Sequence, residues 1–197
     1  MERGGATMSQ GINRALNNEY KSFNERYGFS SAKPCIFLSH RSLDKDAVED
    51  IGKYIKSKGI DIYLDKYDQN LQRADKEGND KDTTECIQKG LKSSTHIMCI
   101  LSEDTVNSWW VPYEIGYGEK IPIEISSLKL AELEEKEIPA FLRIRNCMMG
   151  RSELDNYLEK IIRIYNTLTE SEYKTYKNQK IMFEYASVHP LAKYLDK

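Results

Sequence analysis

The sequence contains no uninterrupted hydrophobic run that approaches the roughly 20 residues needed by a membrane-spanning helix. Its N-terminal stretch, MERGGATMSQGINRALNNEYKSF, also lacks the apolar core of a signal peptide. These two absences predict a cytoplasmic protein that makes no membrane contact.

A predominance of charge of one sign is missing as well. The 197 residues include 29 Lys and Arg against 31 Asp and Glu, for a formal net charge of −2. Because no strong positive field is present, we expect no binding to nucleic acid. Hydrophobic residues make up 40% of the chain and charged residues 30%, a balance typical of a globular protein rather than a disordered one.

Motifs for metal binding and for several enzyme classes are absent. The four cysteines include no C-x-x-C pair and the three histidines lie far apart, so we expect buried free thiols and no metal site. The sequence has no G-x-G-x-x-G motif and no P-loop, which disfavours dinucleotide-binding dehydrogenases and nucleotide triphosphatases. The G-x-S-x-G elbow of many serine hydrolases is also missing.

What the sequence does contain is an alternation of short apolar runs and amphipathic stretches. The runs predict strands, and the stretches, whose apolar residues recur at helical spacing, predict helices. The expected strands are residues 35–40, 60–64, 96–101, 121–125 and 141–145. The expected helices are residues 44–58, 83–94, 108–120 and 152–168, with short helices within 12–23 and 128–137. This order predicts an α/β fold in which helices cover both faces of a parallel sheet.

Residues 65–82, DKYDQNLQRADKEGNDKD, show no apolar period. They predict a long charged loop. A loop of this length inside a compact domain is either functional or a solvated insertion.

Polar side chains follow the first three predicted strands at the points where the apolar runs stop. Ser39, His40 and Arg41 follow the first strand, Asp65 follows the second and Ser102 follows the third. In a parallel sheet, ligands bind outside the carboxyl ends of the strands. We therefore expect these side chains to gather around a ligand, although each could instead cap a turn or face solvent.

The stretch WWVPYEIG, residues 109–116, opens the helix after the third strand. Pro112 suits an early helical position, and Trp110 lies one turn from Glu114 on the same helix face. Trp109, Trp110 and Tyr113 could surround Glu114 with aromatic rings and exclude water from its carboxyl group. We expect one of the two tryptophans to lie in the core.

These segments together resemble one family. IFLSHRSLDKD, YLDKYD and IQKGLKSSTHIMCILSEDTVNSWWVPYEIGYG are similar, in order and spacing, to the successive boxes of a bacterial TIR (Toll/interleukin-1 receptor) domain. The resemblance covers about residues 33–165 and implies a flavodoxin-like fold with a central five-stranded parallel sheet. It divides the chain into a helical extension at 1–32, a TIR domain at 33–168 and a helical tail at 169–197.

The resemblance also implies a function. Some TIR domains are assembly modules, whereas others cleave the nicotinamide–ribose bond of NAD with one essential glutamate, which by motif position is Glu114. NAD is then the substrate and no cofactor is required. Family members commonly act in bacterial antiphage defence, and in Thoeris-type systems the product activates a separate effector protein.

For the remaining residues the resemblance supports weaker roles. Ser39 and His40 could meet a ribose or a phosphate, Arg41 could pair with the pyrophosphate, and Asp65 could bind a ribose hydroxyl. In the family the segment after the second strand often contributes to neighbour contacts. We therefore expect a homo-oligomer formed through TIR–TIR contacts, with residues 66–82 gating the site.

The chemistry of NAD explains how a single carboxylate could suffice. Nicotinamide is a cationic pyridinium in NAD and leaves as a neutral molecule, so no second carboxyl is needed to protonate it, unlike in an ordinary glycoside. A carboxylate near the ribose can stabilise the developing oxocarbenium charge. Water as acceptor gives ADP-ribose, whereas an internal nucleophile gives a cyclic product. A TIR assembly module and a nucleoside deoxyribosyltransferase-like enzyme remain as alternatives.

Overall fold

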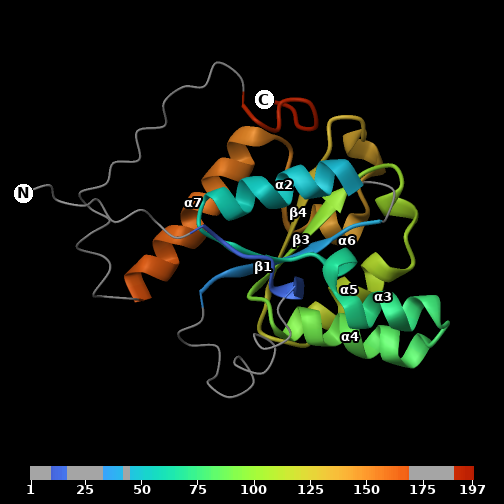
Figure 1. The fold of residues 1–197 in the computed structure, drawn as a ribbon. Helices are drawn as coiled ribbons and strands as arrows, with labels where there is room; N and C mark the ends of the chain where they lie inside the picture. The colour runs from blue at the N-terminus through green and yellow to red at the C-terminus, as the bar shows by residue number, and fades with distance from the viewer. Residues whose placement is uncertain (1–9, 17–32, 42–44, 169–188) are drawn as a thin grey trace, which may run out of the picture.

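The computed structural model describes residues 10–16, 33–41, 45–168 and 189–197. Its centre is a sheet of five strands that pair in parallel throughout, in the order β2-β1-β3-β4-β5 (Figure 1). The strands are β1 (Cys35–Ser39), β2 (Asp61–Tyr63), β3 (His96–Leu101), β4 (Glu124–Lys129) and β5 (Asn146–Met148). The predicted flavodoxin-like α/β fold with a five-stranded parallel sheet is therefore confirmed.

Helices connect the strands and cover both faces of the sheet. They are α2 (Lys45–Ser57), α3 (Gln69–Lys76), α4 (Asp80–Lys92), α5 (Trp110–Gly118), α6 (Ala140–Arg143) and α7 (Arg151–Leu168). Short 3-10 helices are η1 (Arg14–Leu16), η4 (Asp65–Tyr67), η5 (Thr105–Asn107) and η6 (Glu135–Glu137). Among the described residues, no helix is both long enough and apolar enough to cross a membrane.

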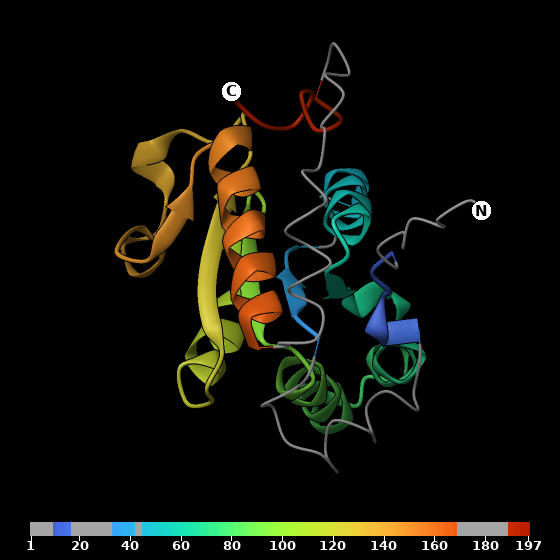
Figure 2. The same ribbon diagram turned by 90° about the vertical axis from the view of Figure 1, so that its left-hand side faces the viewer.

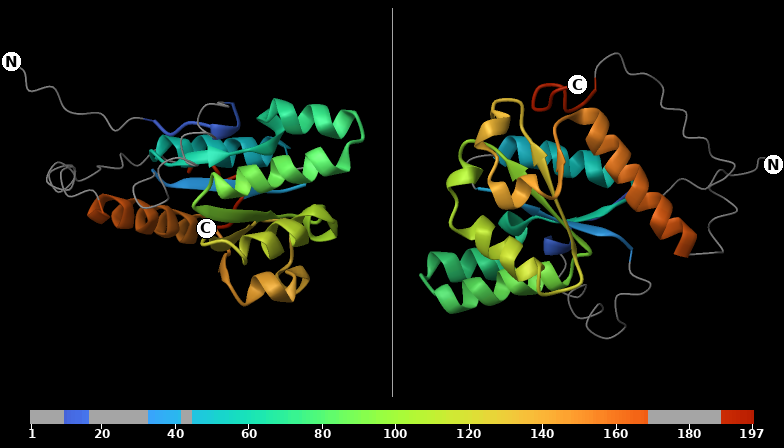
Figure 3. Two further views of the ribbon diagram at one scale, coloured as in Figure 1. Left: turned by 90° about the horizontal axis from the view of Figure 1, so that it is seen from below. Right: turned by 180° about the vertical axis from the view of Figure 1, so that it is seen from behind.

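Successive strand residues point to opposite faces, and this alternation builds two separate cores. Ile36 and Leu38 of β1 pack with α2, α7 and the C-terminal residues. Cys35 and Phe37 pack on the other face with α3, α4 and α5. Figure 2 shows α2 and α7 over different halves of the sheet, and Figure 3 shows α3 and α4 side by side. By the same alternation, Ser39 at the end of β1 belongs to the α5 face.

The strand order reverses between β1 and β3, because the chain passes from β1 out to β2 and then returns to the other side of β1. Such a switch point opens a crevice at the carboxyl ends of the two strands, where ligands bind in this class of sheet. In the β1–β3 register, Ser39 lies opposite Cys99. The sheet therefore places Ser39 and its neighbours at the position where a ligand is expected.

The prediction of a long loop at residues 65–82 is wrong, because these residues form η4, α3 and the start of α4. Asp68 caps α3 by accepting from the backbone N–H groups of Asn70 and Leu71. Only Leu71 and Ala74 anchor α3 to the core, which is too few apolar residues to produce a visible period. Gly78, with a φ of 64°, makes the turn before α4. Gating by this segment stays a prediction.

The fourth and fifth strands lie later than predicted. The apolar residues around Ile121 precede β4, which instead uses Ser126 and Ser127, both fully buried. The Ser126 hydroxyl donates to the Ile97 carbonyl, which makes a serine acceptable inside the sheet. The predicted strand at 141–145 is mainly α6, which follows Pro139, and the predicted helix within 128–137 is reduced to η6.

The two chain ends pack against the sheet where they are described. Residues 189–197 lie against α2 and α7 (Figure 1), where Leu191 and Leu195 enter the core and the Asp196 carboxylate pairs with Lys129 at 3.2 Å. Residues 10–16 run beside β2, with Asn13 bridged to Ile62. Most of the helical extension and of the helical tail expected at the two ends falls outside the described residues.

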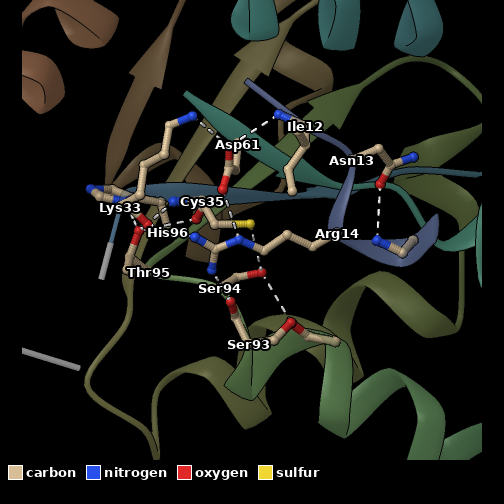
Figure 4. Close-up of polar contacts among 12 residues, drawn as sticks. Ile12, Asn13, Arg14, Lys33, Cys35, Asp61, Ser93, Ser94, Thr95 and His96 are labelled. Atoms are coloured by element: carbon tan, nitrogen blue, oxygen red, sulfur yellow. Dashed lines mark hydrogen bonds and ion pairs between the residues drawn. The ribbon is translucent and has the colours of Figure 1, made fainter. Parts of the chain in front are cut away.

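A buried ion pair secures the N-terminal residues. Arg14 is 1% exposed and donates from Nε to the Asp61 carboxylate at 3.1 Å. Its two terminal nitrogens donate to the carbonyls of Ser93 and Lys33 at 2.6 and 2.7 Å (Figure 4). Removing one partner of such a pair leaves the other charge buried and poorly compensated.

We expect Arg14→Leu to lower the free energy of unfolding by about 3–5 kcal/mol, because it leaves the buried Asp61 carboxylate with less positive charge around it. Urea unfolding followed by circular dichroism measures the loss. Arg73→Leu, at an exposed position, should change stability by no more than about 0.5 kcal/mol. Equal stability of the Arg14→Leu and Arg73→Leu variants would contradict this assignment.

Candidate active site

Glu114 occupies the buried side of α5. The buried residues of this helix are Val111, Glu114, Ile115 and Gly118, which recur at the spacing of an apolar stripe. A carboxyl group therefore stands where the pattern expects an aliphatic side chain. The close packing is most evident at Gly118, where an added Cβ would lie 2.4 Å from Ile97 Cδ1. The helix consequently holds the Glu114 side chain against the sheet, and only 4% of the residue is exposed.

Ser39, at the carboxyl end of β1, is the partner of this carboxyl. Its hydroxyl donates to Glu114 Oε2 at 2.5 Å, and Ser39 is itself buried. The two residues are 75 positions apart in the sequence and meet only because β1 ends below α5. A hydroxyl donor stabilises the ionised form of a carboxyl group, so this contact favours the Glu114 carboxylate.

Burial nevertheless dominates the ionisation of Glu114. It raises the pKa of the Glu114 carboxyl from 4.5 to about 8, and the negative charge of Asp65 adds to this shift, while the Ser39 hydrogen bond opposes it. At neutral pH the group is therefore mainly protonated in the ligand-free protein. A carboxyl with a strongly raised pKa at the ligand-binding edge of a sheet is a candidate catalytic group.

Asp65 and His40 form a second pair at the ends of β2 and β1. His40 Nδ1 lies 3.9 Å from Asp65 Oδ1 and 3.1 Å from the Leu38 carbonyl oxygen. Asp65 Oδ1 is buried and has no hydrogen-bond partner. Burial raises the pKa of the Asp65 carboxyl, and the facing His40 lowers it in part. This oxygen is an acceptor that a ligand hydroxyl could satisfy.

Cys99 is a neighbour of this site that the sequence did not reveal. It is fully buried on β3, directly opposite Ser39 in the strand register. Burial raises the pKa of the Cys99 thiol, the Glu114 charge raises it further, and a hydrogen bond with Ser39 lowers it. The thiol is therefore a neutral packing group beneath the Ser39–Glu114 pair. Only the register between β1 and β3, which no sequence motif encodes, identifies it.

The structure directs two predicted site residues to other partners. The Arg41 side chain is exposed and pairs with Asp104 at 3.8 Å. Ser102 is buried, and its Oγ accepts from the backbone N–H of Thr105 at 3.0 Å, so it caps the turn that begins η5. Both residues lie at strand ends, Arg41 after β1 and Ser102 after β3.

The aromatic residues lie along the outer side of α5. The Trp110 and Tyr113 rings meet edge to face with centroids 5.9 Å apart. The Tyr113 hydroxyl accepts from Gln88 Nε2 of α4 at 2.6 Å, which directs this ring towards α4. Trp109 is 93% exposed and Trp110 is 42% exposed, so the expectation that one tryptophan lies in the core is wrong. Val111 and Ile115, which lie with Glu114 on the buried side of α5, belong to the core.

This arrangement suits a reaction in which positive charge meets a buried carboxyl. A cationic group that enters the crevice favours ionisation of Glu114, and the Ser39 hydroxyl is already placed to stabilise the anion. In the described part of the chain, no three His, Cys, Asp or Glu side chains gather in a way that could hold a metal ion. Cys35, Cys86 and Cys99 are buried free thiols as predicted, and Cys147 is half-buried.

Comparison with known families matches residues 36–162 to the family model described as the TIR domain. This region contains the whole sheet except Cys35 at the start of β1, and it includes Ser39, Asp65 and Glu114. The match therefore covers the fold and the candidate site together.

Two curated relatives extend the comparison. The chain is 27% identical over 134 residues to the probable 3′ cyclic ADP-D-ribose synthase ThsB′ of Bacillus cereus (strain MSX-D12), a match that covers 59% of this chain and 68% of that protein. It is 34% identical over 108 residues to the probable 2′ cyclic ADP-D-ribose synthase TcpO of Methanobrevibacter olleyae, covering 52% of this chain and 26% of that protein. The chain therefore spans about two thirds of the first relative and about a quarter of the second.

We expect Glu114→Gln to stabilise the protein at neutral pH. In the unfolded chain Glu114 releases its proton near 4.5, whereas in the folded protein it does so at about 8. The free energy of unfolding of the natural protein therefore falls as pH rises between these values, and glutamine removes this loss while keeping an oxygen for the Ser39 hydroxyl. The melting temperatures of the two proteins should be similar at pH 4.5 and separate progressively up to pH 8.

Each kcal/mol of difference corresponds to about 2–4 °C in the melting temperature of a protein of this size. Glu132→Gln, which changes an exposed glutamate, is the matched control and should show no such pH trend. A constant difference between Glu114→Gln and the natural protein across this pH range would mean that the carboxyl is not held protonated by burial.

Proposed function

The chain belongs to the TIR domain family, and from this premise we propose that it cleaves the nicotinamide–ribose bond of NAD with Glu114 as the catalytic residue. The observation that carries the proposal is the buried Glu114 carboxyl, held by the Ser39 hydroxyl at the switch point of the sheet. Both curated relatives bear names of cyclic ADP-D-ribose synthases, which supports NAD as the substrate.

The proposed reaction begins with binding of the cationic nicotinamide ring beside the crevice. The positive charge lowers the pKa of the Glu114 carboxyl and favours its ionised form, because opposite charges attract strongly in a site with little water. The Ser39 hydroxyl donates to the resulting carboxylate and keeps it oriented. Binding energy of the substrate is thus used to produce the catalytic anion where it is needed.

Bond cleavage then needs no protonation of the leaving group. The bond between ribose C1′ and the pyridinium nitrogen breaks, its electron pair stays on the nitrogen, and nicotinamide departs neutral. The positive charge that remains on the ribose is stabilised by the Glu114 carboxylate. Asp65 Oδ1, which accepts no hydrogen bond within the protein, is proposed to accept one from a ribose hydroxyl and so to orient the sugar.

We propose a cyclic ADP-ribose as the main product. An internal hydroxyl attacks the ribose cation and releases its proton to solvent, or an unprotonated adenine ring nitrogen attacks through its lone pair. Attack by water instead would give ADP-ribose. The names of both relatives support cyclisation, and because one is a 2′ and the other a 3′ cyclic ADP-D-ribose synthase, they do not select a linkage. The burial of Ser39 and Glu114 favours the internal nucleophile by limiting water at the site.

The wider role follows from the family. We propose that NAD is a substrate rather than a resident cofactor, that the protein acts in the cytoplasm, and that copies associate through TIR–TIR contacts. A nucleotide product made during bacterial antiphage defence would activate a separate effector protein. We propose that Arg41, Trp110 and Tyr113 also contact the substrate near Glu114.

The decisive test compares nicotinamide release from NAD by the natural protein, Glu114→Gln and Glu132→Gln. We expect Glu114→Gln to lose activity by at least about 100-fold, because it removes the stabilising charge, while Glu132→Gln retains full activity. Because Glu114→Gln is expected to be the more stable protein, unfolding would not explain its loss of activity.

Mass analysis of the same reactions identifies the product. A cyclic ADP-ribose lacks one water relative to ADP-ribose, so the two are distinguished directly. Release of nicotinamide with ADP-ribose alone would replace the cyclase by a hydrolase. No turnover under conditions that promote assembly would favour a TIR assembly module, and base exchange on nucleosides without NAD cleavage would favour a deoxyribosyltransferase-like enzyme.

A pH profile tests the role of Ser39. Since the ionised Glu114 is the active form, we expect kcat/KM for NAD to rise with pH and to level off above about 8. Ser39→Ala removes the hydrogen bond that lowers the pKa of Glu114, so its midpoint should move to higher pH. Ser57→Ala, on the surface of α2, should leave the midpoint unchanged. A midpoint that moves to lower pH in Ser39→Ala would refute this role.

A further inference from the structure

Residues 10–16, here called the N-terminal edge segment, lie along the outer edge of β2. β2 is the last strand on its side of the sheet, so the N–H groups of Ile62 and Leu64 have no neighbouring strand there. The Ile62 N–H donates to the Ile12 carbonyl at 2.9 Å. The Leu64 N–H donates to the side-chain oxygen of Asn13 at 3.3 Å. The segment therefore takes the place of a sixth strand for two successive donors.

Close approach and a buried ion pair hold the segment in place. The Gly11 N–H donates to the Lys56 carbonyl, and a Cβ added at Gly11 would lie 1.9 Å from the Ile60 carbonyl oxygen, so only glycine fits. Arg14 reaches beneath the sheet to Asp61 and Ser93 (Figure 4). The Ile12 N–H also donates to the Asp61 carboxylate. These contacts fix the position of Asn13 between the two anchors.

Asn13 accepts a hydrogen bond from Leu64, the residue that precedes Asp65 of the candidate site. Leu64 immediately precedes η4, and η4 begins with Asp65, the residue whose Oδ1 is buried and accepts no hydrogen bond. The Asn13 oxygen also accepts from the Ala15 N–H at 3.1 Å, which ties η1 to the same point, and η1 packs beside η4. Leu64 is buried, so its N–H has no access to water that could replace Asn13.

We propose that Asn13 is a positioning residue of the site, which fixes the turn from β2 into η4 and thereby holds the Asp65 carboxyl near Glu114. The catalytic consequence of this arrangement rests on the proposed NAD cleavage, whereas the positional effect does not. Asn13 touches neither the crevice side of Glu114 nor its Ser39 partner. It acts through the backbone of Leu64 and Asp65.

The charges around the two carboxyls define a readout for this proposal. Asp65 faces His40 and Asp68, and Glu114 faces Asp65 and Cys99. The Asp65 charge raises the pKa of Glu114. If Asp65 moves away when Asn13 is lost, this contribution shrinks and the pKa of Glu114 falls. A general loss of stability would not by itself lower the pKa of Glu114.

The test measures the titration of the Glu114 carboxyl carbon by NMR in the ligand-free protein, with Glu114→Gln used to assign the signal. We expect Asn13→Ala and Asp65→Asn each to lower the midpoint, Asp65→Asn by roughly half a unit or more. The double variant should show the shift of Asp65→Asn and nothing further, because both changes act through one charge. Asn13→Asp, which keeps the acceptor oxygen, should not lower the midpoint.

Two controls separate positioning from destabilisation. Leu16→Ala changes an exposed residue of the same segment and should leave the Glu114 midpoint unchanged. Leu195→Ala removes a core side chain at the C-terminal end and should reduce stability without moving the midpoint. An unchanged midpoint in Asn13→Ala, or a double variant whose shift is the sum of the two single shifts, would overturn the proposal.

A kinetic arm connects the result with catalysis. With NAD as substrate, Asn13→Ala should raise KM about as much as Asp65→Asn does, and Leu195→Ala should leave KM unchanged at a temperature where it is fully folded. If neither the natural protein nor any variant cleaves NAD but the NMR shifts occur as expected, the proposed function is wrong and the positioning role is supported. If NAD is cleaved but the titration midpoint of Glu114 is the same in Asn13→Ala as in the natural protein, only the positioning role is wrong.

Discussion

A carboxyl group in the apolar stripe of a helix is tolerated only if it stays neutral or finds a partner, and Glu114 does both. Burial keeps the Glu114 carboxyl mainly protonated at neutral pH, and the Ser39 hydroxyl is placed to donate a hydrogen bond to the ionised form. An aliphatic residue at this position would pack as well and would stabilise the fold. The buried carboxyl therefore carries a cost in stability that grows as pH rises from 4.5 towards about 8.

The strand order of the parallel sheet brings Glu114 and Ser39 together. The return of the chain from β2 to the far side of β1 places the ends of β1 and β3 next to each other, with Ser39 opposite Cys99. Helix α5, which follows β3 through η5, then lays its buried side across these ends. Helix α5 thus supplies the Glu114 carboxyl, the distant strand β1 supplies the Ser39 donor, and β3 supplies the neutral Cys99 thiol that packs beside them.

The sequence was most informative where a pattern is local. The ordered motifs located Glu114 and Ser39, and the alternation of elements predicted the five parallel strands. Helix α3 was not predicted because only Leu71 and Ala74 of this helix are buried, and two apolar residues do not form a recognisable helical period. The position of β4 was predicted wrongly because it contains two buried serines, Ser126 and Ser127, where a central strand is expected to be aliphatic. The Ser126 hydroxyl donates to the Ile97 carbonyl.

Long-range pairings account for what could not be predicted. Cys99 joins the site through strand register, and Tyr113 turns to Gln88 because α4 packs on α5. The exposure of both tryptophans is different, because it depends only on which side of α5 faces the sheet. The spacing of Val111, Ile115 and Gly118 in the sequence already indicates that side. This stripe by itself predicts that Glu114 is buried and that Trp109 is exposed.

The N-terminal edge segment also limits how copies of this chain can meet. An uncovered outer strand is a template on which another chain can add its own strand, and continued addition of this kind leads to aggregation. Here Ile12 and Asn13 already occupy the outward donors of β2, and Gly11 seats the segment too closely to be displaced by a side-chain rearrangement alone. Self-association on this side must therefore be built from side-chain surfaces, which can be reversed and regulated, and not from an extension of the sheet.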